Sequence, residues 1–392
     1  MMDMVGISVL FTGSVRMAES GGSATAVASV FVISSLTYIL VCRVLGRLVT
    51  PRNAVRIIIA ATALTVLNAG AFVLLSGLRI MYLWLVVQAI ATACFFVPFQ
   101  VFMKALEQGR PAGISRSTAL YTFSWSMGLC CGPFVSGYVW ELFGWQWCHA
   151  VNAILAGTTA VAIFLLRHHG HAIAAEDHGV ANPVNDLYQP FDYSRLPDFA
   201  WLGWLCAGVG CFTFYTTFSL FPSTAQAYSI PKATQGMVLA LVGGAQALTG
   251  LSLIRSRIWM YLVRPVILFG LPGMAGLLLF GSSRNVAFFC VAAICLGIYS
   301  GSFFFYLVFH SLVHPTHSTR YVTINESVVG ICGIAGPLSS GLIADHLSLK
   351  APYYVAAIMV ASAVCFKALV HRKHTSQVRE AMKWVEPEKY RR

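Results

Sequence analysis

Glu326 is the acidic side chain that the hydropathy pattern places inside a long apolar segment and not in a loop or at a segment end. It follows Arg320 by six residues, which corresponds to about 9 Å along a helix. Ionisable side chains are costly inside a membrane, so a functional role is their default interpretation. We expect either a carboxylate that carries a proton or binds a cation, or an ion pair with Arg320 or another basic residue. The sequence does not separate these two roles.

Other polar and aromatic side chains accompany Glu326 in apolar segments. Asn325 is its neighbour, and Gln100 and Gln246 lie in two further segments. Each amide could line a cavity or join two helices by a hydrogen bond worth about 1 kcal/mol, and we favour the hydrogen bond for any one of them. The residues predicted to form a substrate and proton pathway are Glu326, Asn325, Tyr121, Trp125, Gln100, Gln246, Tyr215 and Tyr306.

A Gly-Pro-x-x-Ser-Gly sequence occurs twice, at residues 132–137 and 336–341. The spacing of Pro111, Arg116 and Pro133 is repeated 204 residues later by another proline, arginine and proline, namely Pro315, Arg320 and Pro337. Self-similarity at one offset of about half the chain indicates internal duplication.

The duplicated segments are rich in small residues at helical spacing. Gly128, Gly132 and Ser136 recur every four residues, which places them on one helix face where another membrane helix can approach closely. Residues 233–254 contain a similar face that includes Gly243 and Gly250. We expect these two faces to pack on each other and to form a surface along which the halves rock, and static packing is the alternative. The residues assigned to gating and helix packing are Gly128, Gly132, Pro133, Ser136, Gly137, Gly336, Pro337, Ser340, Gly341, Gly243 and Gly250.

The composition predicts the elements that carry these residues. The chain is 57% hydrophobic and 10% charged, with a mean hydropathy of +0.72, whereas soluble domains carry roughly 25% charged residues. A membrane-spanning helix needs about 20 apolar residues. We therefore predict an all-α polytopic membrane protein with twelve spans, the first one short, at about 4–17, 24–42, 54–76, 80–104, 117–141, 148–167, 199–221, 233–254, 262–281, 286–310, 321–344 and 351–370.

The spans divide into an N-terminal six-helix bundle (1–167), a polar linker (168–198), a C-terminal six-helix bundle (199–370) and a basic tail (371–392). Twenty-one of the 26 Lys and Arg residues fall on the same side of the predicted membrane as the linker. This asymmetry predicts that both termini are cytoplasmic. It also accounts for the net charge of +12 without nucleic-acid binding. We expect a multi-pass monomer of the cell membrane, with a bacterial inner membrane the simplest location.

Several other kinds of chemistry are not supported by the sequence. The eleven cysteines form no Cys-x-x-Cys pair, and the histidines at 168–171 lack further metal ligands at a suitable spacing. No phosphate-binding Gly-x-x-x-x-Gly-Lys-Ser/Thr loop occurs. We expect no cofactor, no metal and no enzymatic activity. His310 lies at a segment end, where we expect it to be solvated, and the tail from His371 should be a solvated anchor.

The two six-helix halves and their polar linker resemble the major facilitator superfamily over nearly the whole chain. The match is most specific in the fifth span, where Gly128, Gly132, Pro133, Ser136 and Gly137 fit the family's antiporter-type motif Gly-x-x-x-Gly-Pro-x-x-small-Gly. The Gly-Trp-Gln-Trp turn at 144–147 is also similar. The resemblance implies a secondary transporter that moves a small molecule across the lipid bilayer by alternating access.

One loop departs from the family pattern. The family carries Gly-x-x-x-Asp-Arg-x-Gly-Arg-Arg between spans two and three, and here Gly46, Arg47 and Arg52 keep its glycine and basic character while Thr50 replaces the acid. The resemblance implies a cytoplasmic gate, to which we assign Gly46, Arg47 and Arg52. Arg116 and Arg320 occupy equivalent positions at the cytoplasmic entries of spans five and eleven. We expect them either to belong to the gate or to reach lipid headgroups with their side chains. We expect proton-coupled efflux of a neutral or amphipathic compound. A non-transporting, receptor-like member and an uptake permease are the alternatives.

Overall fold

The computed structural model of the chain describes residues 1–107, 113–175, 196–253, 258–313 and 318–385. These ranges contain twelve helices of 18 residues or more, as the hydropathy pattern predicts. The first six are α1 (Met2–Glu19), α2 (Ala24–Leu48), α3 (Pro51–Leu74), α4 (Leu78–Glu107), α5 (Gly113–Phe143) and α6 (Trp145–Ala175). The second six are α7 (Ala200–Ala227), α8 (Lys232–Leu253), α9 (Val263–Ser282), α10 (Val286–Val313), α11 (Ser318–His346) and α12 (Ala351–Lys373). A short 3₁₀ helix, η2 (Ile258–Tyr261), precedes α9, and α13 (Thr375–Val385) follows α12.

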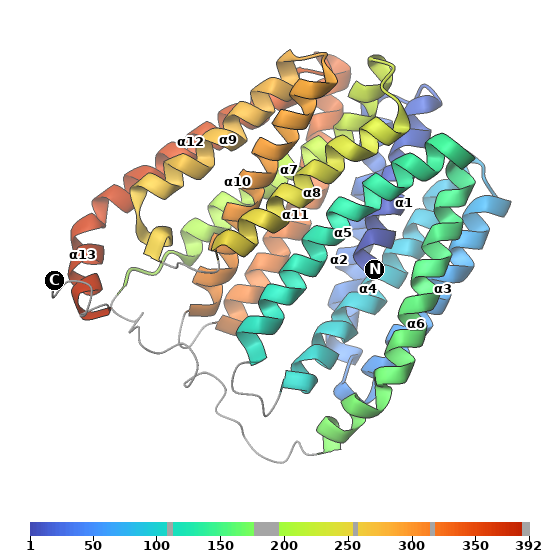
Figure 1. The fold of residues 1–392 in the computed structure, drawn as a ribbon, viewed down its shortest axis with the longest axis horizontal. Helices are drawn as coiled ribbons and strands as arrows, with labels where there is room; N and C mark the ends of the chain where they lie inside the picture. The colour runs from blue at the N-terminus through green and yellow to red at the C-terminus, as the bar shows by residue number, and fades with distance from the viewer. Residues whose placement is uncertain (108–112, 176–195, 254–257, 314–317, 386–392) are drawn as a thin grey trace.

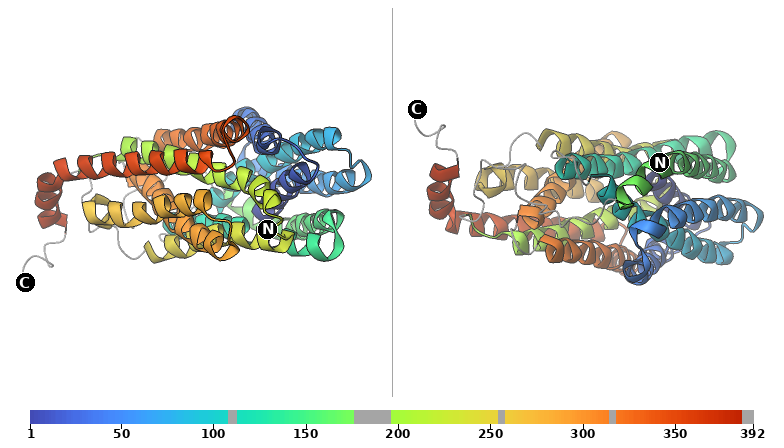
Figure 2. Two further views of the ribbon diagram at one scale, coloured as in Figure 1. Left: turned by 90° about the horizontal axis from the view of Figure 1, so that it is seen from above. Right: turned by 90° about the horizontal axis from the view of Figure 1, so that it is seen from below.

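The helices form two bundles that lie side by side, α1–α6 and α7–α12 (Figures 1 and 2). Helices α5 and α8 pack together along the boundary between the bundles, and so do α2 and α11. The turns α1–α2, α5–α6, α7–α8 and α11–α12 lie at one end of the molecule, which we call the closed end. The end of α6 and the start of α7 lie at the opposite end, which we call the linker end.

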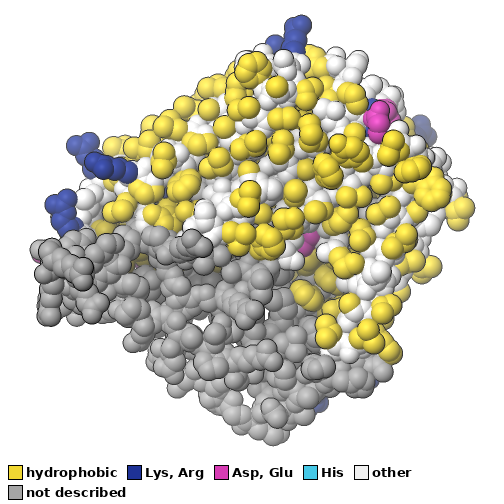
Figure 3. Space-filling model, viewed as in Figure 1, with side chains coloured by type: hydrophobic (Ala, Val, Ile, Leu, Met, Phe, Trp, Pro, Cys, Tyr) yellow, Lys and Arg dark blue, Asp and Glu magenta, His cyan; other side chains and the backbone are white. Residues whose placement is uncertain are grey.

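The surface is that of a protein surrounded by lipid. Ten of the described helices are long and apolar enough to span a membrane, and α1 and α5 complete the N-terminal bundle. Large apolar side chains such as Leu67, Ile154, Leu268 and Ile358 are exposed on the helices. Figure 3 shows hydrophobic side chains spread over the described part of the visible face, with basic side chains near its edges. Because every backbone group of a helix is paired within the helix, this architecture suits the bilayer interior.

Local signals explain where several helices begin. Ser23 precedes α2, and its hydroxyl accepts a hydrogen bond from the Ala26 backbone at 3.2 Å, which is the usual role of serine at a helix start. At α3, the Asn53 side chain accepts from the Thr50 backbone at 2.7 Å, and Pro51 occupies the first helical position. The basic segment that separates the second and third spans is therefore short, because α2 continues to Leu48. Gly144 adopts φ +95° between α5 and α6, a conformation that favours glycine.

The predicted pairing of α5 with α8 is confirmed, but the predicted α5 face is wrong. A side-chain carbon on Gly243 would lie 2.5 Å from the Cys130 backbone nitrogen, and one on Gly236 would collide with the Pro133 carbonyl. Gly128 and Gly132 instead face α1, where a carbon on Gly132 would lie 2.9 Å from the Met4 carbonyl. Helix α5 is thus packed closely on two sides, and the repeat of every fourth residue belongs to the α1 side.

Ser136 belongs to the same α1-facing side of α5. Its hydroxyl donates to the Ser8 hydroxyl of α1 at 2.6 Å, and both side chains are buried. A buried hydroxyl that lacked a partner would be costly in lipid. The small residues of this face therefore hold α1 within its own bundle, whereas α8 reaches α5 from the other half.

Candidate functional site

Glu326 lies on α11 at the boundary between the halves. One turn further along, Gly330 faces the Ile39 side chain of α2, and Gly333 faces Ser35. The Glu326 side chain is exposed, although neighbouring residues of the same helix pack on α2. It is within electrostatic range of Cys42 on α2 and Tyr215 on α7. The carboxylate therefore lies close to both α2 and α7.

The ion pair proposed as an alternative role for Glu326 is not formed in the described part of the chain. The described ion pair, between Lys232 and Glu19, lies at the closed end, and no contact within 4.0 Å joins Glu326 to Arg320. A carboxylate without a fixed cation can gain and lose a proton as its surroundings change. This geometry favours the functional interpretation of Glu326.

Asp3 is a second acid at depth, which the sequence analysis treated as lying outside the first span. It lies in the first turn of α1, half-buried, and a side-chain carbon on Gly128 of α5 would collide with it. The remaining turns of α1 extend about 24 Å from Asp3 to the closed end. A hydrocarbon core is about 30 Å thick. Asp3 therefore lies within the bundle, and the N-terminal half also carries an acid away from its ends.

Two of the predicted amides act as bridges between helices. Gln246 donates to the Ser126 hydroxyl of α5 at 2.9 Å and accepts from Ser300 of α10 at 2.6 Å. The Asn325 side-chain oxygen accepts from the Trp204 indole at 2.8 Å and from the Ser311 hydroxyl at 2.9 Å. Gln246 thus joins the two halves near the middle of α5 and α8. Asn325 ties α11 to α7 and α10 directly beside Glu326.

The other residues predicted to form the pathway do not lie together in the structure. Trp125 of α5 meets Phe304 of α10 edge-on across the boundary, with ring centroids 5.0 Å apart. Tyr215 is half-buried and lies close to Gly333 of α11. Gln100 is exposed on α4. The side chain of Tyr121 lies outside the described part of the chain.

Tyr306 does not line an open path, which corrects its assignment to the pathway. It is fully buried inside the C-terminal bundle, where its hydroxyl lies 3.1 Å from His371 Nε2. His310, expected to be solvated, is also buried, and its ring lies 4.2 Å from that of Tyr306. Lys367 of α12 is buried next to Tyr306 and His310. The sequence pattern had placed it among the basic residues on the linker side of the membrane. Apolar patterning missed this cluster because its members are spaced along α10 and α12 near segment ends.

A carboxylate on α5 holds the start of α8 at the closed end. The Glu141 side chain accepts a hydrogen bond from the Lys232 backbone at 2.7 Å, and Lys232 is the first residue of α8. The Lys232 ammonium also pairs with Glu19 of α1 at 2.7 Å. Gly137 allows the close approach, because a side-chain carbon there would lie 2.5 Å from the Lys232 carbonyl. We call this set the α5 clasp.

An equivalent set of contacts occurs between α11 and α2. The Asp345 carboxylate accepts from the backbone nitrogens of Ala24 at 2.8 Å and Thr25 at 3.0 Å, at the start of α2. A side-chain carbon on Gly341 would lie 2.7 Å from the Thr25 α-carbon. We call this set the α11 clasp. In each clasp a carboxylate of one half occupies the positive end of a helix of the other half, which is a favourable electrostatic arrangement.

The clasps are part of the internal duplication. Glu141 and Asp345 are 204 residues apart, the same offset that relates Pro133 to Pro337, and each acid follows the last glycine of its Gly-Pro-x-x-Ser-Gly sequence by four residues. Hydropathy gives neither acid a functional role, because both lie at predicted span ends. Their shared offset is the signal that could have found them.

The residues of the predicted gate at the linker end do not form contacts like those of the clasps. Arg47, Arg52 and Arg320 are exposed, and no acid of the described chain lies within 4.0 Å of them. Gly46 has open space where a side chain would lie. The Arg116 side chain lies outside the described residues. In this conformation, the described ion pair and carboxylate contacts between the halves lie at the closed end.

The remaining motif residues support helix packing. Gly336 faces the Phe212 carbonyl of α7, and the buried Ser340 donates to the Pro337 carbonyl of its own helix at 2.9 Å. Gly250 of α8 meets nothing within 4 Å. It therefore does not take part in the close helix contact predicted for it.

Substitution of Gly132 by alanine should lower the thermal stability of the protein. The added carbon would lie 2.9 Å from the Met4 carbonyl and 3.2 Å from Ile7, so α1 and α5 would have to separate. Overpacking of this kind typically costs about 1–3 kcal/mol. Gly250→Ala is the matched control, since its added carbon meets nothing. Equal melting temperatures for the two variants in detergent would contradict the packing described for Gly132.

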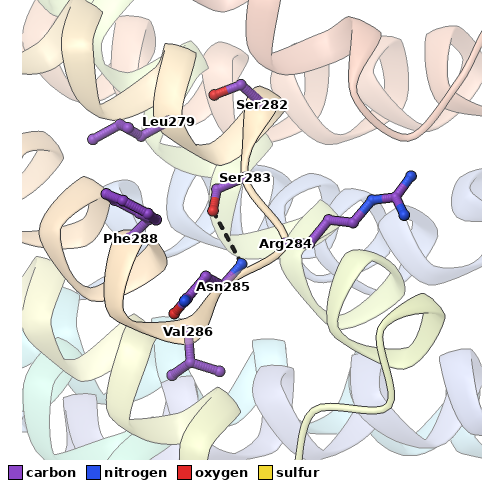
Figure 4. Close-up of a pocket in the computed structure, with 7 residues that line it drawn as sticks. All are labelled: Leu279, Ser282, Ser283, Arg284, Asn285, Val286 and Phe288. Carbon is purple, nitrogen blue, oxygen red and sulfur yellow. Dashed lines mark hydrogen bonds between the residues drawn. The ribbon is translucent and has the colours of Figure 1, made fainter.

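A hollow at the closed end lies apart from the boundary between the halves. It surrounds the α9–α10 turn, has a volume of about 750 Å³ and is lined by Leu279, Ser282, Ser283, Arg284, Asn285, Val286 and Phe288 (Figure 4). The Asn285 backbone donates to the Ser283 hydroxyl at 3.0 Å within the turn. The Arg284 guanidinium lies 5.8 Å from the centre of the Tyr228 ring. Because one turn supplies most of its walls, we interpret the hollow as a surface feature of that turn and not as a binding site.

Comparison with known proteins identifies the family. A family model described as the Major Facilitator Superfamily matches residues 1–309 and 203–389. The chain belongs to this superfamily. No curated protein matches the sequence. Among solved structures, the crystal structure of the nucleoside transporter NupG is similar, with a TM-score of 0.65, 11% identity, and coverage of 95% of this chain and 97% of that chain.

Membership of the superfamily applies to both bundles together. Its members are membrane transporters, and the similarity to NupG extends over both halves of the fold. At 11% identity, the similarity concerns the fold and not the ligand. The clasps and the exposed Glu326 are accordingly features of a superfamily member whose halves are joined by carboxylate contacts at the closed end.

Proposed function

We propose that this superfamily member is a secondary transporter that moves a small molecule across the membrane by alternating access. The observation that carries the proposal is the asymmetry between its ends. Two duplicated clasps join the halves at the closed end, while Glu326 is exposed beside α2 further toward the linker end. Halves related by duplication can rock about a central site, so that one end opens as the other closes.

The charge distribution supports an orientation for this state. The loops of the closed end hold few basic residues, namely Arg16, Arg79, Lys232, Arg284 and Lys350, whereas the linker end holds most of the others. Positively charged loops remain in the cytoplasm. We propose that the closed end faces away from the cytoplasm and that both termini are cytoplasmic. The described conformation is then sealed on the outside.

The residues at the boundary support a neutral or amphipathic substrate. Trp125 and Phe304 meet between the halves, and Tyr215 and the exposed acid Glu326 lie near the boundary on the C-terminal half. Aromatic walls with a few polar groups suit a flat organic molecule better than a multiply charged one. Nucleosides are neutral and aromatic, and the similar solved structure is that of a nucleoside transporter. They belong in the first panel of compounds.

We propose that a proton gradient drives the transport through Glu326. Export remains our preferred direction because of the antiporter-type motif in α5, and an uptake permease is the alternative. A carboxylate reached from water can carry one proton per cycle, provided that its protonation depends on which end is open. Asp3 is the second acid that could take part, since it lies on the opposite half at depth.

Counterflow in proteoliposomes tests the function. Purified protein is reconstituted in vesicles loaded with an unlabelled compound, and accumulation of the same labelled compound is followed for uridine, adenosine and a set of neutral amphipathic molecules. We expect transient accumulation of at least one compound that protein-free vesicles do not show. Ligand-induced thermal stabilisation without any counterflow would overturn the transporter and favour the receptor-like alternative. An imposed pH gradient of either sign then gives the direction.

A further inference from the structure

The C-terminal bundle contains a buried cation that has no carboxylate partner in the described chain. Lys367 lies on α12 with 8% of its surface exposed, and its ammonium lies 3.2 Å from the centre of the Tyr306 ring. No Asp or Glu of the described residues lies within 4.0 Å of it. Asp198, at the start of α7, accepts hydrogen bonds from Tyr321 and from the Ala200 backbone instead. A buried ammonium that lies on an aromatic face and has no carboxylate beside it lacks a compensating negative charge.

A second unpartnered donor lies beside the same cavity. The indole nitrogen of Trp259, in η2, is buried and has no hydrogen-bond acceptor. Trp259 and Lys367 both line a cavity between α9, α10 and α12, and the cavity has a volume of about 20 Å³. An indole nitrogen and an ammonium can only donate hydrogen bonds. The cavity therefore presents donors and a positive charge.

The other walls supply no competing negative charge. Cys206 contributes a thiol and no carboxylate, Ser302 donates its hydroxyl hydrogen to the Tyr299 carbonyl at 2.7 Å, and the remaining walls include Val266, Phe269 and Val364. His310, whose ring lies 4.2 Å from the Tyr306 ring, has a buried Nε2 without a partner. The group that completes this environment must accept hydrogen bonds and should carry a negative charge.

We propose that this cavity binds a chloride-sized inorganic anion between Lys367 and Trp259. Its volume admits about one water-sized particle, so a phosphate, a sulfate or a lipid headgroup is too large. A water molecule would satisfy the indole but would leave the lysine charge uncompensated in the bilayer. A halide fulfils both requirements, and it would join η2 and α12 within the C-terminal bundle. The site is separate from Glu326 and from the clasps, and it does not depend on the proposed transport.

Thermal unfolding of the full-length protein in detergent tests the site. Sodium chloride is titrated into sodium gluconate at constant ionic strength, because gluconate is too large for the cavity. We expect a saturable rise in the melting temperature with chloride and with bromide, and none with sulfate. Trp259→Phe should raise the half-saturating halide concentration at least tenfold, and Lys367→Met should abolish the response. Trp201→Phe, an exposed tryptophan on α7, is the matched control.

Two results would overturn the proposal. One is an equal melting temperature of the parent protein in chloride and gluconate, with no protein-dependent broadening of the chloride-35 resonance. The other is a halide response that survives unchanged in both variants, which would place the ion elsewhere. If Lys367→Met does not fold, the Trp259→Phe titration and the resonance of the parent protein still decide the question.

Discussion

A chain with alanine in place of both Glu141 and Asp345 should populate a state in which the closed end is open. Each carboxylate accepts backbone hydrogen bonds from the first turn of a helix in the opposite half. Both acids are exposed, so we assign about 1 kcal/mol to each and not the larger values of buried ionic hydrogen bonds. Together they amount to about 2 kcal/mol, or roughly a 30-fold shift in the equilibrium between the two states.

The accessibility of a buried position at the closed end measures this shift. Ala28 is 1% exposed, and its side chain lies close to Gly341 at the α2–α11 contact. In a background whose reactive native cysteines are replaced, Ala28→Cys should react with a water-soluble maleimide roughly 30 times faster when both acids are alanine. Glu380→Ala, an exposed acid on α13, is the control. An unchanged labelling rate in the double variant would show that the clasps do not hold this end closed.

Replacement of Glu326 by glutamine should abolish accumulation driven by a pH gradient while counterflow persists. The amide keeps the size and hydrogen-bonding capacity of the side chain but cannot bind and release a proton. Substrate exchange needs only the movement of the loaded protein, so it should continue. We expect gradient-driven accumulation to fall at least 100-fold, and counterflow to change less than threefold. This separation distinguishes a coupling residue from a structural one.

Glu380→Gln is the matched control for this measurement, and Asp3→Asn is the informative comparison. Gradient-driven accumulation that survives in Glu326→Gln but is lost in Asp3→Asn would move the coupling to α1. If Glu326→Gln loses both counterflow and gradient-driven accumulation, Glu326 has a role in folding or substrate binding instead. Expression and melting temperature of each variant decide between those two.

The sequence predicted the fold through features that act over long stretches. Apolar segments of about 20 residues and the twofold Gly-Pro-x-x-Ser-Gly sequence indicated twelve helices in two halves, and small residues at helical spacing indicated the contact between α5 and α8. These features are robust because each depends on many residues. The helix face was less secure, since Gly128 and Gly132 share a face but their spacing does not say which neighbour lies opposite. The structure shows that this neighbour is α1.

The candidate site was less predictable, because it depends on individual contacts. Hydropathy located Glu326, but Glu141 and Asp345 resembled ordinary acids at span ends. Their role becomes visible once each is seen at the start of a helix from the other half. Lys367 illustrates the opposite case. It was counted with the basic residues that record orientation, yet it points into its own bundle, onto the Tyr306 ring.

Distances between the halves, measured at both ends of the same protein, test alternating access most directly. Spin labels at Ser20 and Ser348 report on the closed end, and labels at Arg47 and Arg320 report on the linker end, all at exposed positions. Pulsed electron resonance would compare the parent protein with the Glu141→Ala, Asp345→Ala variant. Our account predicts that the variant gains a longer distance at the closed end and a shorter one at the linker end. A closed end that opens with no change at the linker end, or no change at either, would contradict it.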